Sequence, residues 1–179
     1  MKKLTMPKMA LLLMFLSAFF LPRFLMAQET IIKESDEAKA SFQKGDPSMK
    51  NLFDNSYGYA IFPNVGKGAA GVGGAAGKGV VYEKGKAVGT AEMVQVTVGA
   101  QAGGQAYREV IFFENKAALE RFQASKYEFS AQTSAIAVKS GASANANYRD
   151  GVVVFTQEKG GLMLEASLGG QKFSYKPLK

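Results

Sequence analysis

The chain has no cysteine and no histidine among its 179 residues. Without histidine it lacks the usual general base of a nucleophilic triad, and without cysteine it lacks the thiol nucleophile. The same absences remove the side chains that normally hold zinc, copper or haem iron. No Asp-x-Asp-x-Asp-Gly loop for calcium is present, and nothing points to the carboxylate pair of a glycoside hydrolase. We therefore expect a binding protein, with no enzymatic activity, no cofactor and no metal site.

The first 27 residues have the pattern of an export signal. A basic start precedes an apolar run over 9–21, which is shorter than the roughly 20 residues that a bilayer-spanning helix needs. Ala27 supplies the small residue that cleavage requires, although Arg23 after the run leaves an uncleaved anchor as an alternative. The absence of cysteine excludes lipoprotein processing and disulfides. The sequence predicts a signal peptide over 1–27, one domain over 28–179, and a periplasmic, outer-membrane or secreted location.

The net charge falls from +7 to +3 when the predicted signal is removed, because that segment carries four basic groups and no acidic one. A domain with a charge of +3 has no obvious nucleic-acid footprint, so we expect no nucleic-acid partner. Attraction to an anionic membrane would have to come from local clusters of lysine.

The domain is predicted to begin with helices. Apolar residues at near-helical spacing predict an amphipathic helix over about 29–44, ended by Gly45. Asp46 and Pro47 then suit the N-cap and first position of a second, short helix, which must end by Gly58.

The rest of the chain favours β-structure. Alternation over 94–107 predicts a strand that bends or turns near Gly103-Gly104, because the run is too long for one ordinary strand. Asn115 is expected to cap a short helix, and alternation resumes over about 128–138. Hairpin turns are predicted at Lys84-Gly85 and at Lys159-Gly160-Gly161. The expected fold is α+β, with N-terminal helices packed on a curved, mostly antiparallel, barrel-like and glycine-rich β-sheet.

The segment from Gly66 to Gly79 is nearly free of side chains, with seven glycines and four alanines in fourteen positions. Gly66 to Gly71 matches G-x-G-x-x-G, but the residues that follow form a poor helix, so we reject a dinucleotide site. A bare backbone can approach a phosphate or a lipid headgroup closely, and lysines are the only charged residues in this segment. The alternative is a tightly bent strand packed under a helix.

We predict that this segment binds anionic lipid through cations, each contributing roughly 1 kcal/mol near an anionic surface, and through neighbouring aromatic rings. Solvated lysines and buried aromatics are the competing interpretation. The predicted contact residues are Lys67, Lys78, Lys84, Lys86, Tyr57, Tyr59 and Phe62.

Several blocks of the mature chain together resemble the SYLF lipid-binding domain family in its short, exported bacterial form. They are Tyr57-Gly-Tyr-Ala-Ile-Phe-Pro63 with Gly66-Lys-Gly68, Gly71-Val-Gly-Gly74 with Gly79-Val-Val-Tyr82, Gly103-Gly-Gln-Ala-Tyr107 with Ile111-Phe-Phe-Glu114, and Gly161-Leu-Met163 with Gly169-Gly-Gln-Lys-Phe173. The resemblance implies non-enzymatic phospholipid binding. For an exported protein, the expected partner is an anionic phospholipid of the bacterial envelope.

Two other functions compete with this one. One is a structural or interaction module whose glycine-rich sheet packs against an envelope protein. The other is a small transmembrane β-barrel, which the helical beginning and the absence of an aromatic residue at the C-terminus argue against.

Overall fold

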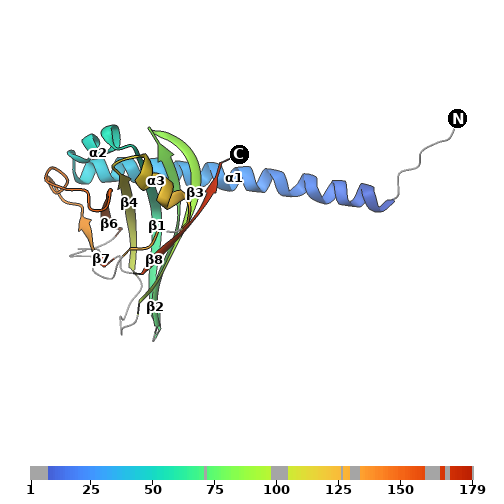
Figure 1. Ribbon diagram of the computed structural model, residues 1–179. Coiled ribbons are helices and arrows are strands. Elements are labelled where there is room, and N and C mark those ends of the chain that lie inside the picture. Colours follow the sequence, from blue (N-terminus) through green and yellow to red (C-terminus); the bar gives the residue numbers. More distant parts are fainter. Residues whose placement is uncertain are drawn as a thin grey trace.

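The computed structural model describes residues 8–70, 72–97, 105–125, 127–129, 134–159, 166–167 and 170–178. Three helices and a twisted sheet make up this part of the chain (Figure 1). The helices are α1 (Lys8–Gly45), α2 (Met49–Asn55) and α3 (Lys116–Gln123). The observed architecture is α+β, as the sequence predicts.

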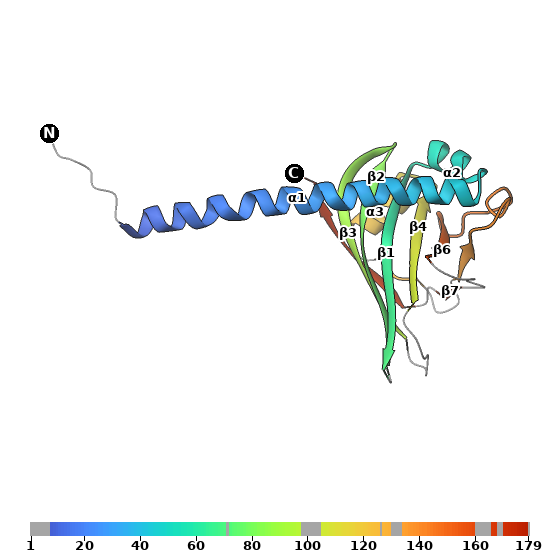
Figure 2. The ribbon, with the colours of Figure 1, turned by 180° about the vertical axis from the view of Figure 1, so that it is seen from behind.

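Helix α1 contains the amphipathic helix expected over 29–44 and continues from it toward the N-terminus (Figure 2). Its residues Ala38 and Phe42 are fully buried against the sheet. Gly45 ends the helix, as predicted. The interpretation of residues 1–27 as a cleaved signal stays a prediction.

The second helix begins later than expected. Asp46 is not its cap; α2 starts at Met49, and Ser48 occupies the N-cap position. The Asp46 carboxylate instead accepts hydrogen bonds from the backbone N–H of Ser48, Gly141 and Ser143. Asp46 therefore ties the α1–α2 connection to a loop almost a hundred residues further along.

The sheet is mixed and mostly antiparallel. Its strands are β1 (Gly58–Ala70), β2 (Val72–Glu83), β3 (Lys86–Thr97), β4 (Gln105–Phe113), β5 (Ser134–Ala137), β6 (Val152–Glu158), β7 (Ala166–Ser167) and β8 (Gln171–Pro177). They lie in the order β7-β5-β6-β4-β1-β2-β3-β8, and within the described residues β5 and β6 are the only pair in parallel. Lys84 and Gly85 form the predicted β2–β3 turn with positive φ angles of 48° and 78°.

The expectation of a barrel-like sheet is wrong. Within the described residues, β7 and β8 are the two ends of the strand order and do not pair with each other. The free edge of β8 is covered instead by the segment that follows α3, where Phe129 N–H donates to Gln171 O and Tyr175 N–H donates to Ser125 Oγ. With the edge of β8 occupied in this way, the described strands form a curved sheet that does not close.

The alternation over 94–107 belongs to two strands that are not neighbours. β3 and β4 are separated in the sheet by β1 and β2, and the bend predicted at Gly103-Gly104 lies outside the described residues. The strand expected over 128–138 is not one strand: its described residues 134–137 form β5, whereas Glu128 makes an isolated bridge to Lys172 of β8. The predicted turn after Lys159 also lies largely outside the description, and β6 and β7 each pair with β5 rather than with each other.

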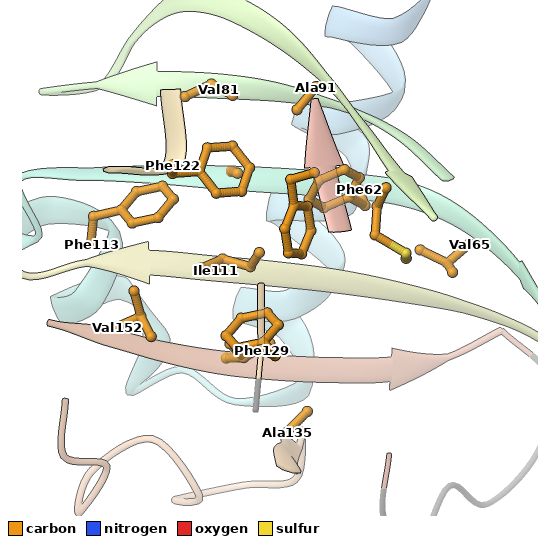
Figure 3. Packing of buried hydrophobic residues seen from close by; sticks show 14 of the residues in the cluster. Phe62, Val65, Val81, Ala91, Ile111, Phe113, Phe122, Phe129, Ala135 and Val152 are labelled. Atoms are coloured by element: carbon orange, nitrogen blue, oxygen red, sulfur yellow. The ribbon is translucent and has the colours of Figure 1, made fainter. Parts of the chain in front are cut away.

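Two apolar cores lie on opposite faces of the sheet. On one face α1 and α2 cover a cluster that includes Tyr59, Val80 and Phe112. On the concave face α3 covers a larger cluster that is rich in aromatic rings (Figure 3). Asn115 caps α3 as predicted, because its Oδ1 accepts a hydrogen bond from Ala118 N–H at 3.0 Å.

Candidate functional site

The glycine-rich segment is not a loop. It forms the half of the β1–β2 hairpin that lies farther from α1, which we call the distal half. Most of its described glycines have a steric reason inside the protein. A Cβ atom on Gly79 would lie 2.4 Å from the carbonyl oxygen of Ile61, and one on Gly77 would lie 3.0 Å from that of Asn64. These glycines let β1 and β2 approach each other where the hairpin is irregular between Ile61 and Asn64.

Gly66 has no such reason. It is exposed, its φ is not positive, and a Cβ atom placed on it would find no heavy atom within 4 Å. Glycine inside a strand costs roughly 0.5–1 kcal/mol relative to alanine. Nothing among the described residues accounts for that cost, whereas close approach of an external surface to this backbone would account for it.

Gly66 belongs to a row of small, exposed residues that crosses four strands. Cross-strand pairing sets Ala106 of β4 beside Gly66, Gly66 beside Ala76 of β2, and Ala76 beside Val94 of β3. Val94 is 54 % exposed, although valine usually packs in a core. We call these four residues the bare row.

A second row lies one step closer to α1 on the same face. It consists of Asn64, Lys78, Glu92 and Ser174, all exposed and paired across β1, β2, β3 and β8. Lys78 Nζ lies 3.7 Å from Glu92 Oε1, and Asn64 donates to Glu34 of α1. We call these four residues the polar row.

Both rows lie on the sheet face that α1 crosses, but beyond the area that α1 covers. Helix α1 passes over the strands near their other end, and the distal ends of β1 and β2 extend away from it in both views (Figures 1 and 2). A sheet surface with small side chains therefore remains uncovered. No helix within the described part of the chain has the length and apolar character needed to cross a bilayer.

Lysine side chains lie around the bare row, but acidic or polar side chains contact them. Lys172 continues the row on β8 and lies 3.8 Å from Glu128, and Lys159 donates to Asn64. Burial and the nearby Arg108 lower the pKa of Lys159. The ion pairs are exposed, so an anionic ligand competes for these lysines at little cost.

The four predicted lysines do not form one cluster. Lys78 lies in the polar row, whereas Lys84 and Lys86 lie at the β2–β3 turn, at the opposite end of β2. Lys67 is on β1 opposite Ala75, about 30 Å along the hairpin from Lys84 at roughly 3.3 Å per residue. The side chain of Lys67 lies outside the description. A membrane surface that contacts a short stretch of the hairpin therefore cannot touch Lys67 and Lys84 at the same time.

The three aromatic residues predicted to contact lipid also lie in different places. Tyr59 and Phe62 are fully buried on opposite faces of the sheet, where they pack in the two cores. Tyr57 is half-buried, donates from its hydroxyl to Glu83 at 2.8 Å, and lies under Lys84 Nζ, which is 5.3 Å from its ring. Of the three rings, only that of Tyr57 reaches the surface, and it does so at the turn rather than at the bare row.

Sequence reasoning missed Ala76, Val94, Ala106 and Lys172. Ala76 lay in the segment we singled out, but small residues of distant segments gave no signal of a common row. Their adjacency depends on the pairing of β1 with β4 and of β3 with β8, which the sequence alone did not specify. Among the described residues, no group of three or more acidic side chains could hold a metal ion.

Comparison with known proteins supports one family. Residues 94–177 match the model of the Ysc84 family, described as Las17-binding protein actin regulator. The chain is also 31% identical over 149 residues to Beta cell expansion factor A of Aeromonas veronii. That alignment covers 78% of this chain and 53% of the relative, so the chain spans about half the length of the curated relative it matches.

Proposed function

The chain belongs to the Ysc84 (SYLF) domain family of generally non-catalytic domains associated with lipid binding, and we propose that it binds anionic phospholipid at a membrane surface. The binding surface is the distal hairpin, with the bare row lying against the membrane and Lys78, Lys159 and Lys172 contacting phosphates. The proposed setting is the envelope of a bacterium, reached by export.

The observation that carries this proposal is the uncovered backbone at Gly66. A membrane surface is flat, and it offers both anionic headgroups and apolar chain segments. A row of glycine, alanine and valine brings the backbone within reach of such a surface, and the exposed Val94 adds an apolar contact.

The electrostatic part is modest and salt-dependent. Each lysine near an anionic surface contributes roughly 1 kcal/mol, and three contribute roughly 3 kcal/mol before the neighbouring acids are considered. Glu92 and Glu128 reduce this attraction because they lie beside two of the three lysines. Binding should therefore weaken strongly as salt screens the exposed charges.

Co-sedimentation of the chain with vesicles tests the proposal. Vesicles of phosphatidylglycerol and phosphatidylcholine should bind the protein at low salt and release it at high salt, while vesicles of phosphatidylcholine alone should bind little. Equal binding to both vesicle types, or no binding to either, contradicts the proposal.

A protein-interaction module is the second candidate function, because an uncovered sheet face also suits another protein. The description of the Ysc84 family as Las17-binding protein actin regulator refers to binding of a protein by other members of the family. A protein partner captured without vesicles and blocked by a charge at Gly66, together with no vesicle binding, would favour this alternative.

A further inference from the structure

A cluster of polar side chains is buried on the concave face of the sheet, at the edge of the aromatic core. Glu109 of β4, Thr156 of β6 and Gln171 of β8 are completely buried, and Gln95 of β3 is almost so. Glu109 lies directly opposite Thr156, and Gln95 lies directly opposite Gln171. The side-chain amide of Gln171 donates to Glu109 Oε2 at 3.0 Å, which joins the two pairs.

Several oxygen atoms in this cluster have no hydrogen-bond partner among the described residues. They are Glu109 Oε1, Thr156 Oγ1 and Gln171 Oε1. A buried acceptor without a donor costs about 1–3 kcal/mol, and a buried carboxylate costs more. A proton on Glu109 changes this balance, because the neutral acid is a donor and no longer carries charge.

No cation among the described residues faces Glu109. The groups that face Glu109 include the hydroxyl of Tyr107, which is on the same strand. Thr156 and the carboxylate of Glu158 face it from β6. Strand β8 presents Gln171, β3 presents Gln95, and β1 presents the apolar Phe62 opposite Glu109. Burial therefore raises the pKa of Glu109 from 4.5 to about 7, and the hydrogen bond from Gln171 opposes this rise only in part.

Two members of the cluster, Gln95 and Gln171, lie directly behind the outer surface that carries the bare row, and Gln171 connects them to Glu109. Gln95 follows Val94 on β3, and Gln171 precedes Lys172 on β8. Adjacent residues of a strand point to opposite faces, so the concave face here carries the polar cluster and the outer face carries the bare row. Any loosening between β3, β4 and β8 at the cluster also disturbs the outer surface.

We propose that Glu109 is a pH-dependent switch in the part of the sheet farthest from α1. Its protonation state controls how tightly the strands there hold together. As a neutral acid it holds β4, β6 and β8 together and preserves the shape of the outer surface; as a carboxylate it loosens these strands and weakens the outer surface as a binding site. The inference rests on the proposed function for its effect on lipid, while its effect on the sheet is independent of that function.

The test compares the full chain with Glu109→Gln at pH 5.5 and pH 8, measuring amide hydrogen exchange and binding to vesicles of phosphatidylglycerol and phosphatidylcholine. The phosphate of phosphatidylglycerol stays ionised over this range, so the vesicle charge is constant. Glu114→Gln is the matched control, because it makes the same acid-to-amide change at an exposed position beside the end of β4. After correction for intrinsic rates, opening of β8 should increase about 30-fold from pH 5.5 to pH 8.

Glu109→Gln should abolish that response and also the accompanying loss of vesicle binding, while Glu114→Gln should respond like the unaltered chain. A full pH response in Glu109→Gln, or none in the unaltered chain, overturns the switch. If hydrogen exchange responds as expected but vesicles never bind, the switch in the sheet stands and the proposed lipid function fails.

Discussion

Gly66 lies directly opposite Ala76 across the β1–β2 hairpin, and the space above it is open on the outer face of the sheet. The pair forms the centre of the bare row, between Ala106 and Val94. A side chain of either charge can therefore be placed on Gly66 without a steric penalty. This position gives direct experimental access to the proposed binding surface.

A charge introduced at Gly66 should change lipid binding according to its sign. We expect Gly66→Glu to weaken binding to anionic vesicles about fivefold and Gly66→Lys to strengthen it about fivefold, since one charge near the surface contributes roughly 1 kcal/mol. Co-sedimentation measures both affinities. Asn51→Glu on α2 is the control for a charge elsewhere on the surface, and an equal effect there would mean that only net charge matters.

The lysines at the two ends of β2 should differ in their effects. Lys78→Ala removes a cation of the polar row and should reduce binding to anionic vesicles by about fivefold. Lys84→Ala and Lys86→Ala should have little effect, because these residues lie at the opposite end of the strand. The reverse order of effects in the same assay would place the lipid at the β2–β3 turn, beside Tyr57.

Substitution of two glycines by alanine should have opposite effects on stability. Gly79→Ala should lower the free energy of unfolding by about 1–3 kcal/mol, because its Cβ would lie 2.4 Å from a backbone oxygen and 2.8 Å from Phe62 Cδ1. Gly66→Ala should raise it by about 0.5–1 kcal/mol, since the site is open and alanine loses less entropy. Urea unfolding monitored by circular dichroism measures both. A destabilised Gly66→Ala would show that Gly66 has a structural role inside the chain.

Stability should depend on pH through Glu109. The pKa of this group is higher in the folded than in the unfolded chain, so the unfolded state loses its proton first as pH rises. The free energy of unfolding should therefore fall by about 3 kcal/mol between pH 4.5 and pH 7 and then level off. Urea titrations at several pH values should show this fall, and Glu109→Gln should remove it. Unchanged pH dependence in that variant would assign the effect to another group.

Asp46 should stabilise the connection between α1 and α2. Burial by itself would raise its pKa, but hydrogen bonds from Ser143, Gly141 and Ser48 outweigh burial and hold the pKa of this carboxyl below its usual value. Asp46→Ala removes an ionised acceptor from three backbone donors and should cost about 2–4 kcal/mol in urea unfolding. Asp54→Ala, on the exposed side of α2, should cost much less. Equal costs would contradict this role.

The sequence predicted local structure better than it predicted the site. The helix over 29–44, the Asn115 cap and the Lys84-Gly85 turn follow from periodicity and residue chemistry, which act over a few neighbours, and all three are confirmed. The open sheet was not foreseen, because closure depends on which segment occupies the edge of β8. The bare row was missed for a similar reason: Gly66, Ala76, Val94 and Ala106 become neighbours only through pairing between strands far apart in the sequence.

The most direct test of the account uses the absence of cysteine, since a single introduced cysteine can carry an environment-sensitive fluorophore without competing thiols. We would label Val94→Cys in the bare row and, in a second protein, Asn51→Cys on α2 at the far end of the sheet. We expect phosphatidylglycerol vesicles to shift the emission of the label at position 94 to the blue and to leave the label at position 51 unchanged. A bound protein whose label at position 94 still reports water, while the label at position 51 shifts, would contradict it.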